Sequence, residues 1–215
     1  GIGDGTFFVH VGDDVGSSHS WRAGLSYLQT KAKNRSSGDG FFTASDGADA
    51  VGIFDGKSKT MIADFVWKWA PDGNSKYRSF KLQGEYFQRR EKGTLDCQDD
   101  AGAACNGGAG VVSDYRTRQS GGYLQGVYQF SSNWRAGLRY DRLDSGSRHF
   151  GANDANIVNS SFTPKRLTVM ADYSWSEFLR MRLQFAQDKS MQGVTDYQIW
   201  LQYIMSLGAH GAHKF

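Results

Sequence analysis

Tyr197-Gln198-Ile199-Trp200-Leu201-Gln202-Tyr203-Ile204-Met205-Ser206-Leu207 is the stretch that decides the fold class. Its odd positions are all apolar or aromatic, and its even positions include Gln198, Gln202 and Ser206. Successive side chains of a strand point to opposite faces, so this pattern predicts a β-strand with one apolar face and one polar face. The last residue, Phe215, has the same parity as the apolar face.

Eight earlier segments alternate in the same way, which predicts nine strands in all. Their apolar positions are Phe7, Val9 and Val11; Trp21, Ala23, Leu25 and Tyr27; Met61, Ala63, Phe65, Trp67 and Trp69; Phe80, Leu82, Gly84 and Tyr86; Leu124, Gly126, Tyr128 and Phe130; Trp134, Ala136, Leu138 and Tyr140; Leu167, Val169, Ala171, Tyr173 and Trp175; and Leu179, Met181, Leu183 and Phe185. The segment lengths suit membrane strands of about 9–11 residues.

The connections between these segments alternate in length. Short ones read DDVGSSH, PDGNSKY, SSN and SWS, whereas long ones cover about residues 33–57, 92–117 and 144–164, and the link near Met191 is also on the long side. Short turns on one rim and long loops on the other are typical of outer-membrane barrels. We therefore predict an all-β, antiparallel transmembrane β-barrel, with Trp67, Trp69, Trp134 and Trp175 on the lipid face near the short-turn rim.

Composition narrows the alternatives. Mean hydropathy is −0.54, and no run approaches the ~20 apolar residues of a membrane helix. The net charge of +3 is small and scattered, so we expect no nucleic-acid partner. No cofactor is expected. The length of 215 residues predicts a single domain over residues 1–215. An odd strand count predicts that this domain is part of a larger, even-stranded barrel.

The polar parity of the strands is rich in charge. A charged side chain that faces lipid at mid-bilayer costs about 2–4 kcal/mol, so this face should contact water or internal partners. The predicted pore-lining residues are Arg22, Lys68, Lys81, Glu85, Arg89, Arg135, Arg139, Asp141, Asp172, Arg180, Arg182 and Asp188. Because basic residues outnumber acidic ones, we expect a channel for small hydrophilic solutes with a modest anion bias. The alternative is a structural or adhesion barrel whose lumen is filled by ion pairs.

Two further patterns concern cysteine and histidine. Cys97 and Cys105 lie in the loop CQDDAGAAC, which suggests a local disulfide outside the cell. His210 and His213 form HxxH, and His19 lies on a predicted short turn. On a strand an HxxH pair points to opposite faces, so we predict no metal site, although metal binding by these three histidines stays open.

An outer-membrane enzyme is a weaker hypothesis. His149 stands near Asp141, Asp144 and Ser145, but these residues form no known catalytic motif, and G-x-S-x-G is missing. We therefore expect no catalytic residues and no enzyme activity.

Several segments resemble the C-terminal part of a Gram-negative outer-membrane porin-like β-barrel family, whose members are often labelled zinc-regulated or TonB-dependent outer-membrane receptors. They are SWRAGLSYL, KLQGEYFQRRE, GGYLQGVYQF, NWRAGLRYDRLDSG, RLQFAQDKS and LQYIMSLGAHGAHKF. The resemblance implies a location in the bacterial outer membrane, with outer-membrane lipid and lipopolysaccharide as neighbours and a possible homo-oligomer. Tyr203 and Phe215 would form the signal that the barrel-assembly machinery reads. Family members are longer at the N-terminus, so we expect an N-terminally truncated chain.

Overall fold

The computed structural model describes residues 4–37, 42–43, 49–98 and 111–206. Apart from two short 3-10 turns, η1 (Pro71–Gly73) and η3 (Gly151–Asn153), its regular elements are all strands. They are β1 (Gly5–Val15), β2 (His19–Ser36), β3 (Phe42–Thr43), β4 (Asp49–Trp69), β5 (Ser79–Gln98), β6 (Val111–Gln129), β7 (Trp134–His149), β8 (Lys165–Ser174), β9 (Leu179–Lys189) and β10 (Asp196–Met205). No helix within the described ranges is long and apolar enough to cross a membrane.

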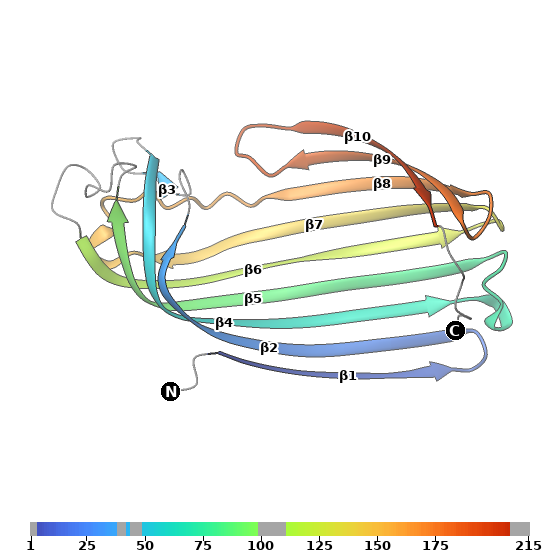
Figure 1. Ribbon diagram of the computed structural model, residues 1–215, viewed down its shortest axis with the longest axis horizontal. Helices are drawn as coiled ribbons and strands as arrows, with labels where there is room; N and C mark the ends of the chain where they lie inside the picture. The colour runs from blue at the N-terminus through green and yellow to red at the C-terminus, as the bar shows by residue number, and fades with distance from the viewer. Residues whose placement is uncertain (1–3, 38–41, 44–48, 99–110, 207–215) are drawn as a thin grey trace.

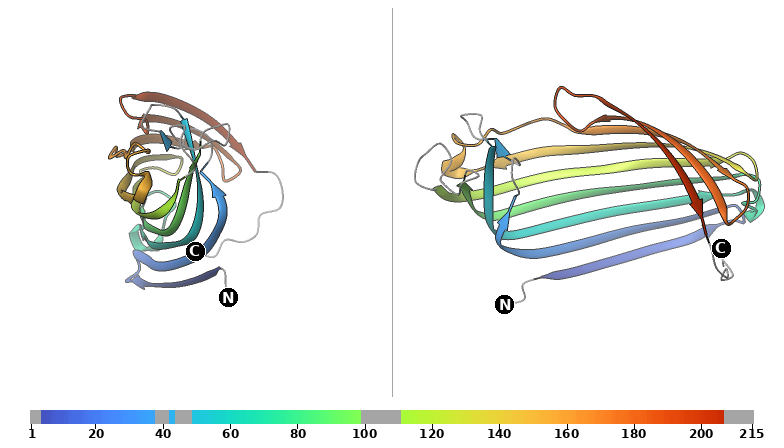
Figure 2. Two further views of the ribbon diagram at one scale, coloured as in Figure 1. Left: turned by 90° about the vertical axis from the view of Figure 1, so that its left-hand side faces the viewer. Right: turned by 45° about the horizontal axis from the view of Figure 1, so that its top comes forward.

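All of the long strands belong to one antiparallel sheet, in the order in which they occur in the chain, and the short β3 pairs with β4 at its side. The sheet curls into a trough, which is clearest in the end-on view of Figure 2. Within the described part of the chain, β1 pairs with β2 alone and β10 with β9 alone, so the sheet is not closed. The predicted all-β antiparallel fold is confirmed, whereas closure into a barrel stays a prediction.

The convex face of the sheet carries the apolar positions predicted from the sequence. Leu25 is 59% exposed, Leu138 53% and Ile199 74%. One row of neighbouring residues crosses all nine long strands: Val11, Ala23, Phe65, Gly84, Leu124, Tyr140, Leu167, Gln187 and Tyr197. We call the exposed apolar residues of the convex face, taken together, the apolar belt. On β10 it extends from Tyr197 to Met205, which corresponds to about 27 Å at the usual rise of a strand.

The two ends of the trough differ in their connections. At the right-hand end in Figure 1, tight turns join β1 to β2, β4 to β5, β6 to β7 and β8 to β9, as predicted. At the other end the strands are longer than expected, because β4 has 21 residues and β5 has 20. Large parts of the predicted long loops are therefore strand: residues 33–36, 49–57, 92–98, 111–117 and 144–149. The link near Met191 is short, since β9 ends at Lys189 and β10 begins at Asp196.

At the long-strand end, β4 and β5 turn towards the inside of the trough (Figure 1), and a glycine pair in this half of the two strands lets their backbones approach closely. Gly56 and Gly93 are direct partners in the β4–β5 ladder. A Cβ atom on Gly93 would collide with the Asp55 carbonyl oxygen, and a Cβ atom on Gly56 would lie 2.7 Å from the Gly93 Cα. Two strands can therefore bend inward together only if neither carries a side chain here.

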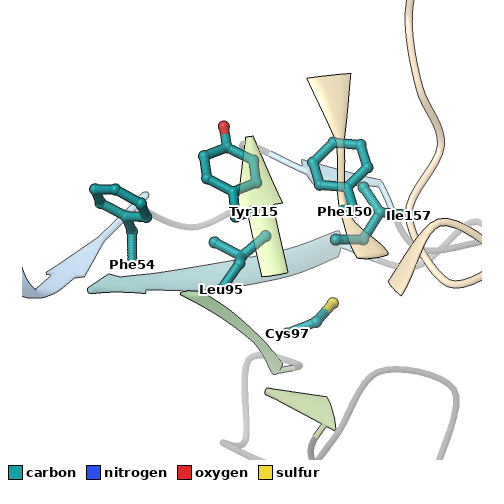
Figure 3. Close-up of a cluster of buried hydrophobic side chains, with 6 residues drawn as sticks. All are labelled: Phe54, Leu95, Cys97, Tyr115, Phe150 and Ile157. Atoms are coloured by element: carbon teal, nitrogen blue, oxygen red, sulfur yellow. The ribbon is translucent and has the colours of Figure 1, made fainter. Parts of the chain in front are cut away.

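Beyond this bend the inner face becomes apolar and forms the buried core of the chain. This outer core consists of Phe54, Leu95, Cys97, Tyr115, Phe150 and Ile157, drawn in Figure 3. The Tyr115 ring lies 5.5 Å from that of Phe54 and 5.7 Å from that of Phe150. Buried Asn153 donates hydrogen bonds to the Leu95 carbonyl oxygen and to Ser113 Oγ, which fixes η3 over the strands.

The outer core explains why the long-loop prediction was wrong. The segments 92–98 and 111–117 flank a stretch rich in Gly, Ala and Asp in the sequence, yet alternate residues in them are buried: Leu95, Cys97, Ser113, Tyr115 and Thr117. Cys97 itself lies within β5 and is 1% exposed, rather than in a loop. Cys105 lies outside the described residues, so the disulfide stays a prediction.

Ile157→Ala should destabilise the protein by about 2–5 kcal/mol, because it deletes buried methyl groups and leaves a cavity. The side chain is 2% exposed, whereas that of the adjacent Val158 is 51% exposed. Val158→Ala is therefore the matched control and should change the free energy of unfolding by no more than about 0.5 kcal/mol. The measurement is urea unfolding of the protein in detergent micelles. Equal shifts for the two variants would contradict the assignment of the outer core.

Candidate functional site

The inner face holds a hollow of about 720 Å³ near the tight-turn end. Six of the predicted pore-lining residues contribute to it, from five different strands: Lys68, Lys81, Arg135, Arg139, Asp172 and Arg182. Side chains from so many strands of a single sheet can meet around one space only on its concave side. Trp69, expected on the outer face, is also among the lining residues. It ends β4, where the chain turns into η1.

Three arginines surround one buried carboxylate beside this hollow, and two of them, Arg135 and Arg182, line it. Asp172 is 1% exposed. Arg182 donates to both of its oxygens, from Nε at 2.6 Å and from Nη2 at 3.0 Å. Arg135 and Arg180 approach the same carboxylate at 3.8 Å and 3.9 Å. We call these four residues the Asp172 cluster. The ladder explains the geometry, because Asp172 is the direct partner of Arg135 on one side and of Arg182 on the other.

A second ion-paired group lies further along the inner face. Arg139 donates to both oxygens of Asp141, with the shortest distance 2.7 Å, and its guanidinium carbon lies 3.8 Å from the Tyr123 ring centroid. Arg166 lies 3.6 Å from Asp188. These residues, Tyr123 excepted, line an open hollow of about 570 Å³.

The acidic residues of the inner face are concentrated in one row. In the ladder Asp64 is the partner of Glu85, Glu85 of Tyr123, Tyr123 of Asp141, Asp141 of Arg166, and Arg166 of Asp188. We call this the acidic row. Lys68 and Lys81 face each other across the same two strands that carry Asp64 and Glu85, four positions nearer the tight turns. On β4 and β5 the charge of the inner face is thus banded along the trough rather than mixed.

A histidine closes the acidic row at the β1 edge. His10 Nε2 lies 3.1 Å from Asp64 Oδ2, although β2 runs between their strands. The residue between them in the ladder is Gly24, and a Cβ atom there would collide with both side chains. The glycine therefore permits the contact.

A third hollow, of about 280 Å³, lies beside the outer core and is also arginine-rich. Glu91 is buried there, 2.8 Å from Arg35 and in a short ion pair with Arg89. Arg148 lines the same hollow, and its buried Nε has no hydrogen-bond partner among the described residues. Of these residues, the sequence analysis had identified Arg89 alone as pore-lining.

Two β-bulges account for the residues that were missed. The β2–β4 ladder shifts register between Ala32 and Arg35, and Asn34 has a φ of 50°. The β6–β7 ladder shifts between Arg118 and Ser120, opposite a stretch that contains Gly146 with a φ of 60°. A bulge adds one residue to one strand, which reverses the parity beyond it and brings Arg35 and Arg148 to the inner face. Asn and Gly tolerate positive φ, so Asn34 and Gly146 were the sequence features that could have indicated the two bulges.

Glu91 lies outside the apolar belt. On β5 the belt ends at Tyr86, because the next outward-facing residues, Gln88, Arg90 and Lys92, are polar or charged. Burial alone would raise the pKa of Glu91, but hydrogen bonds from Arg35 and Arg89 outweigh it and lower the pKa below its ordinary value. Burial raises the pKa of the neighbouring Tyr115, with a further contribution from the charge of Glu91. Glu91 therefore stays ionised at neutral pH and holds two arginines against the outer core.

The remaining predicted residues are placed as follows. Arg22 is exposed and lines none of these hollows, while Glu85 lies in the acidic row. Tyr203 is 64% exposed on β10, and Phe215 lies outside the described residues, so the assembly signal stays a prediction. Within the described ranges no three His, Cys, Asp or Glu side chains are placed to hold a metal ion. His210 and His213 lie outside those ranges.

Glu91 should make the protein less stable in acid. Its folded-state pKa is lowered, so its contribution is present above the pKa of the unfolded state and is lost as the pH falls through the folded pKa. The urea midpoint of the wild type should therefore fall more between pH 7 and pH 3 than that of Glu91→Gln. Glu177→Gln, at an exposed turn position, is the control and should follow the wild type. The same pH dependence in all three proteins would contradict the role given to Glu91.

Comparison with known proteins adds little to this geometry. No protein-family model matches the chain, and no solved structure matches it. The chain is similar to an uncharacterized protein of Aquifex aeolicus (strain VF5), with 26% identity over 169 residues. The match covers 75% of this chain and 32% of the Aquifex protein, so the chain spans about a third of the length of that relative.

Proposed function

We propose that this chain forms part of the wall of an outer-membrane β-barrel channel for small hydrophilic solutes, with a modest preference for anions. The observation that carries the proposal is the inverted distribution of side chains. The convex face of the sheet exposes an apolar belt, whereas the concave face holds charged residues, several of them in ion pairs.

The dimensions and extent of the apolar belt support a lipid-facing role. Monomeric soluble proteins rarely expose contiguous apolar patches larger than a few hundred Å², yet this belt crosses all nine long strands. Its length of about 27 Å on β10 is close to the ~25 Å apolar band of outer-membrane barrels. Trp134 and Trp175 are 44% and 52% exposed beside the tight turns, where such barrels carry an aromatic girdle.

The inner face supports passage of charged solutes. The largest hollow is lined by five basic and two acidic residues: Lys68, Lys81, Arg135, Arg139 and Arg182, with Asp14 and Asp172. Basic side chains around a pore favour anions. The carboxylates of the acidic row, two of them paired with arginine, oppose part of this field, so we expect the preference to be modest.

A membrane location places a requirement on the two edges of the sheet. In lipid every backbone polar group needs a partner, so β1 and β10 must be joined by strands other than those described. A larger even-stranded barrel of a longer chain would supply them, and a homo-oligomer is the alternative source. Outer-membrane lipid and lipopolysaccharide would then cover the apolar belt, and the barrel-assembly machinery would insert the protein.

A structural or adhesion barrel with a filled lumen is the second candidate. The outer core favours it, because apolar side chains pack on the inner face at one end of the trough. Ion pairs such as Arg139–Asp141 also occupy inner space. This candidate shares the fold and membrane position of the first and differs in conduction.

The orientation of the two faces can be tested with neighbouring residues of β8. Val169 is 43% exposed on the apolar belt, and Thr168 lines the largest hollow. Val169→Arg should destabilise the folded protein in lipid vesicles by about 2–4 kcal/mol, whereas Thr168→Arg should cost much less because its charge reaches water. Urea unfolding in vesicles measures both. A larger cost for Thr168→Arg would reverse the assignment of lipid and solvent faces.

Conduction separates the two candidates. Full-length protein in planar bilayers under a KCl gradient should give a reversal potential that indicates Cl⁻ preference. Lys68→Glu with Lys81→Glu should shift it towards K⁺, since both residues line the largest hollow. Lys57→Glu with Lys59→Glu, on exposed positions of β4, changes the same charge and should have little effect. Folded protein that conducts no ions would favour the filled barrel.

A further inference from the structure

The Asp172 cluster contains more hydrogen-bond donors than its carboxylate can accept. Arg182 already engages both oxygens of Asp172. The distances of 3.8 Å from Arg135 and 3.9 Å from Arg180 are ion-pair contacts that are too long for hydrogen bonds. Arg135 instead donates to Ser174 Oγ at 3.2 Å. The buried Nε of Arg180 has no hydrogen-bond partner among the described residues.

The same cluster carries an excess of positive charge. Three guanidinium groups surround one carboxylate, and arginine is charged at any ordinary pH. The neighbouring Lys68 and Lys81 line the same hollow and add to the field. Partly buried cations without a matching anion are costly, and a bound anion would remove that cost.

We propose that Arg135 and Arg180, held in place around the Arg182–Asp172 pair, form a saturable binding site for the oxyanion group of a small solute, a carboxylate or a phosphate. The inference rests on the proposed function for its biological meaning, because it identifies which anions the channel would select. The site itself is a property of the folded chain and can be measured without ion flow.

The chemistry of the donors favours oxyanions over chloride. A guanidinium group presents a planar fork of N–H donors that matches two oxygens of a carboxylate or phosphate at once. A spherical halide cannot accept such a bidentate pair. The adjoining hollow of about 720 Å³ is also large enough for a small organic anion.

Asp172 acts in this arrangement as a positioning residue. Its carboxylate fixes Arg182, and its charge draws Arg135 and Arg180 to the same place on the wall. The other three-arginine group, at Glu91, differs because Arg35 and Arg89 both contact the carboxylate closely. The hollow beside that group, of about 280 Å³, is also smaller than the one beside the Asp172 cluster.

The test is isothermal titration calorimetry on the full-length protein folded in detergent micelles. Sodium phosphate and sodium acetate are titrated separately, against sodium chloride at constant ionic strength. The wild type should bind phosphate, acetate or both saturably above the chloride background. The variant Arg135→Gln with Arg180→Gln should weaken this binding by about tenfold or more, because each lost charge-assisted hydrogen bond is worth about that factor.

The choice of variants distinguishes a loss of anion binding from a loss of folding. The double variant leaves the Arg182–Asp172 pair intact, so no buried carboxylate loses its partner, and the change in electrophoretic mobility on heating checks that the barrel has folded. Arg22→Gln removes an inner-face arginine away from the hollow and should bind like the wild type. No saturable binding by the folded wild type, unchanged binding by the double variant, or an equal loss in Arg22→Gln would overturn the site. Binding without conduction would reject the channel alone, and conduction without binding would reject the site alone.

Discussion

A single curled sheet has no second layer to cover its faces, and the rest of this structure depends on what contacts each face: apolar groups on one side, and water or ion-pair partners on the other. In a sandwich or an α/β fold, the apolar face of a sheet packs against another layer of the same protein. Here the apolar belt has no such layer among the described residues, while the polar face turns inward. Lipid can satisfy a belt of this kind. If lipid covers the belt, alternation along each strand places apolar side chains outside and charged side chains inside, which is the reverse of a water-soluble protein.

The inner face is organised at some cost to stability. Lys68 lies directly opposite Lys81, and Asp64 lies opposite Glu85, although like charges in opposed positions are unfavourable. Exchanging one residue between these pairs would create two favourable contacts. The observed arrangement instead keeps charge of one sign together on these two strands, which suits the proposed passage of charged solutes. Stability that is given up in this way is common at functional sites.

Much of the wall could be predicted from alternation alone. The parity of residues such as Val169 and Thr168 depends on local sequence, and the structure places the first on the convex side and the second in a hollow of the concave side. Groupings across strands could not be predicted, because the acidic row depends on the register between neighbours. Arg35 and Arg148 were missed since a bulge reverses parity beyond it. The outer core was missed because its inward residues alternate with polar ones in segments that resemble loops.

The glycine pair Gly56–Gly93 gives the chain a modular construction. On one side of the bend the wall depends on ladder hydrogen bonds and on whatever covers the belt. On the other side the strands are held by a compact apolar core of their own. The two parts share backbone ladders, and Arg35 joins them through side chains, since it lies 2.8 Å from Glu91 and over the Phe54 ring. Residues of the outer core that do not contact this arginine are therefore expected to tolerate replacement, during evolution or by design, without a change in the wall below them.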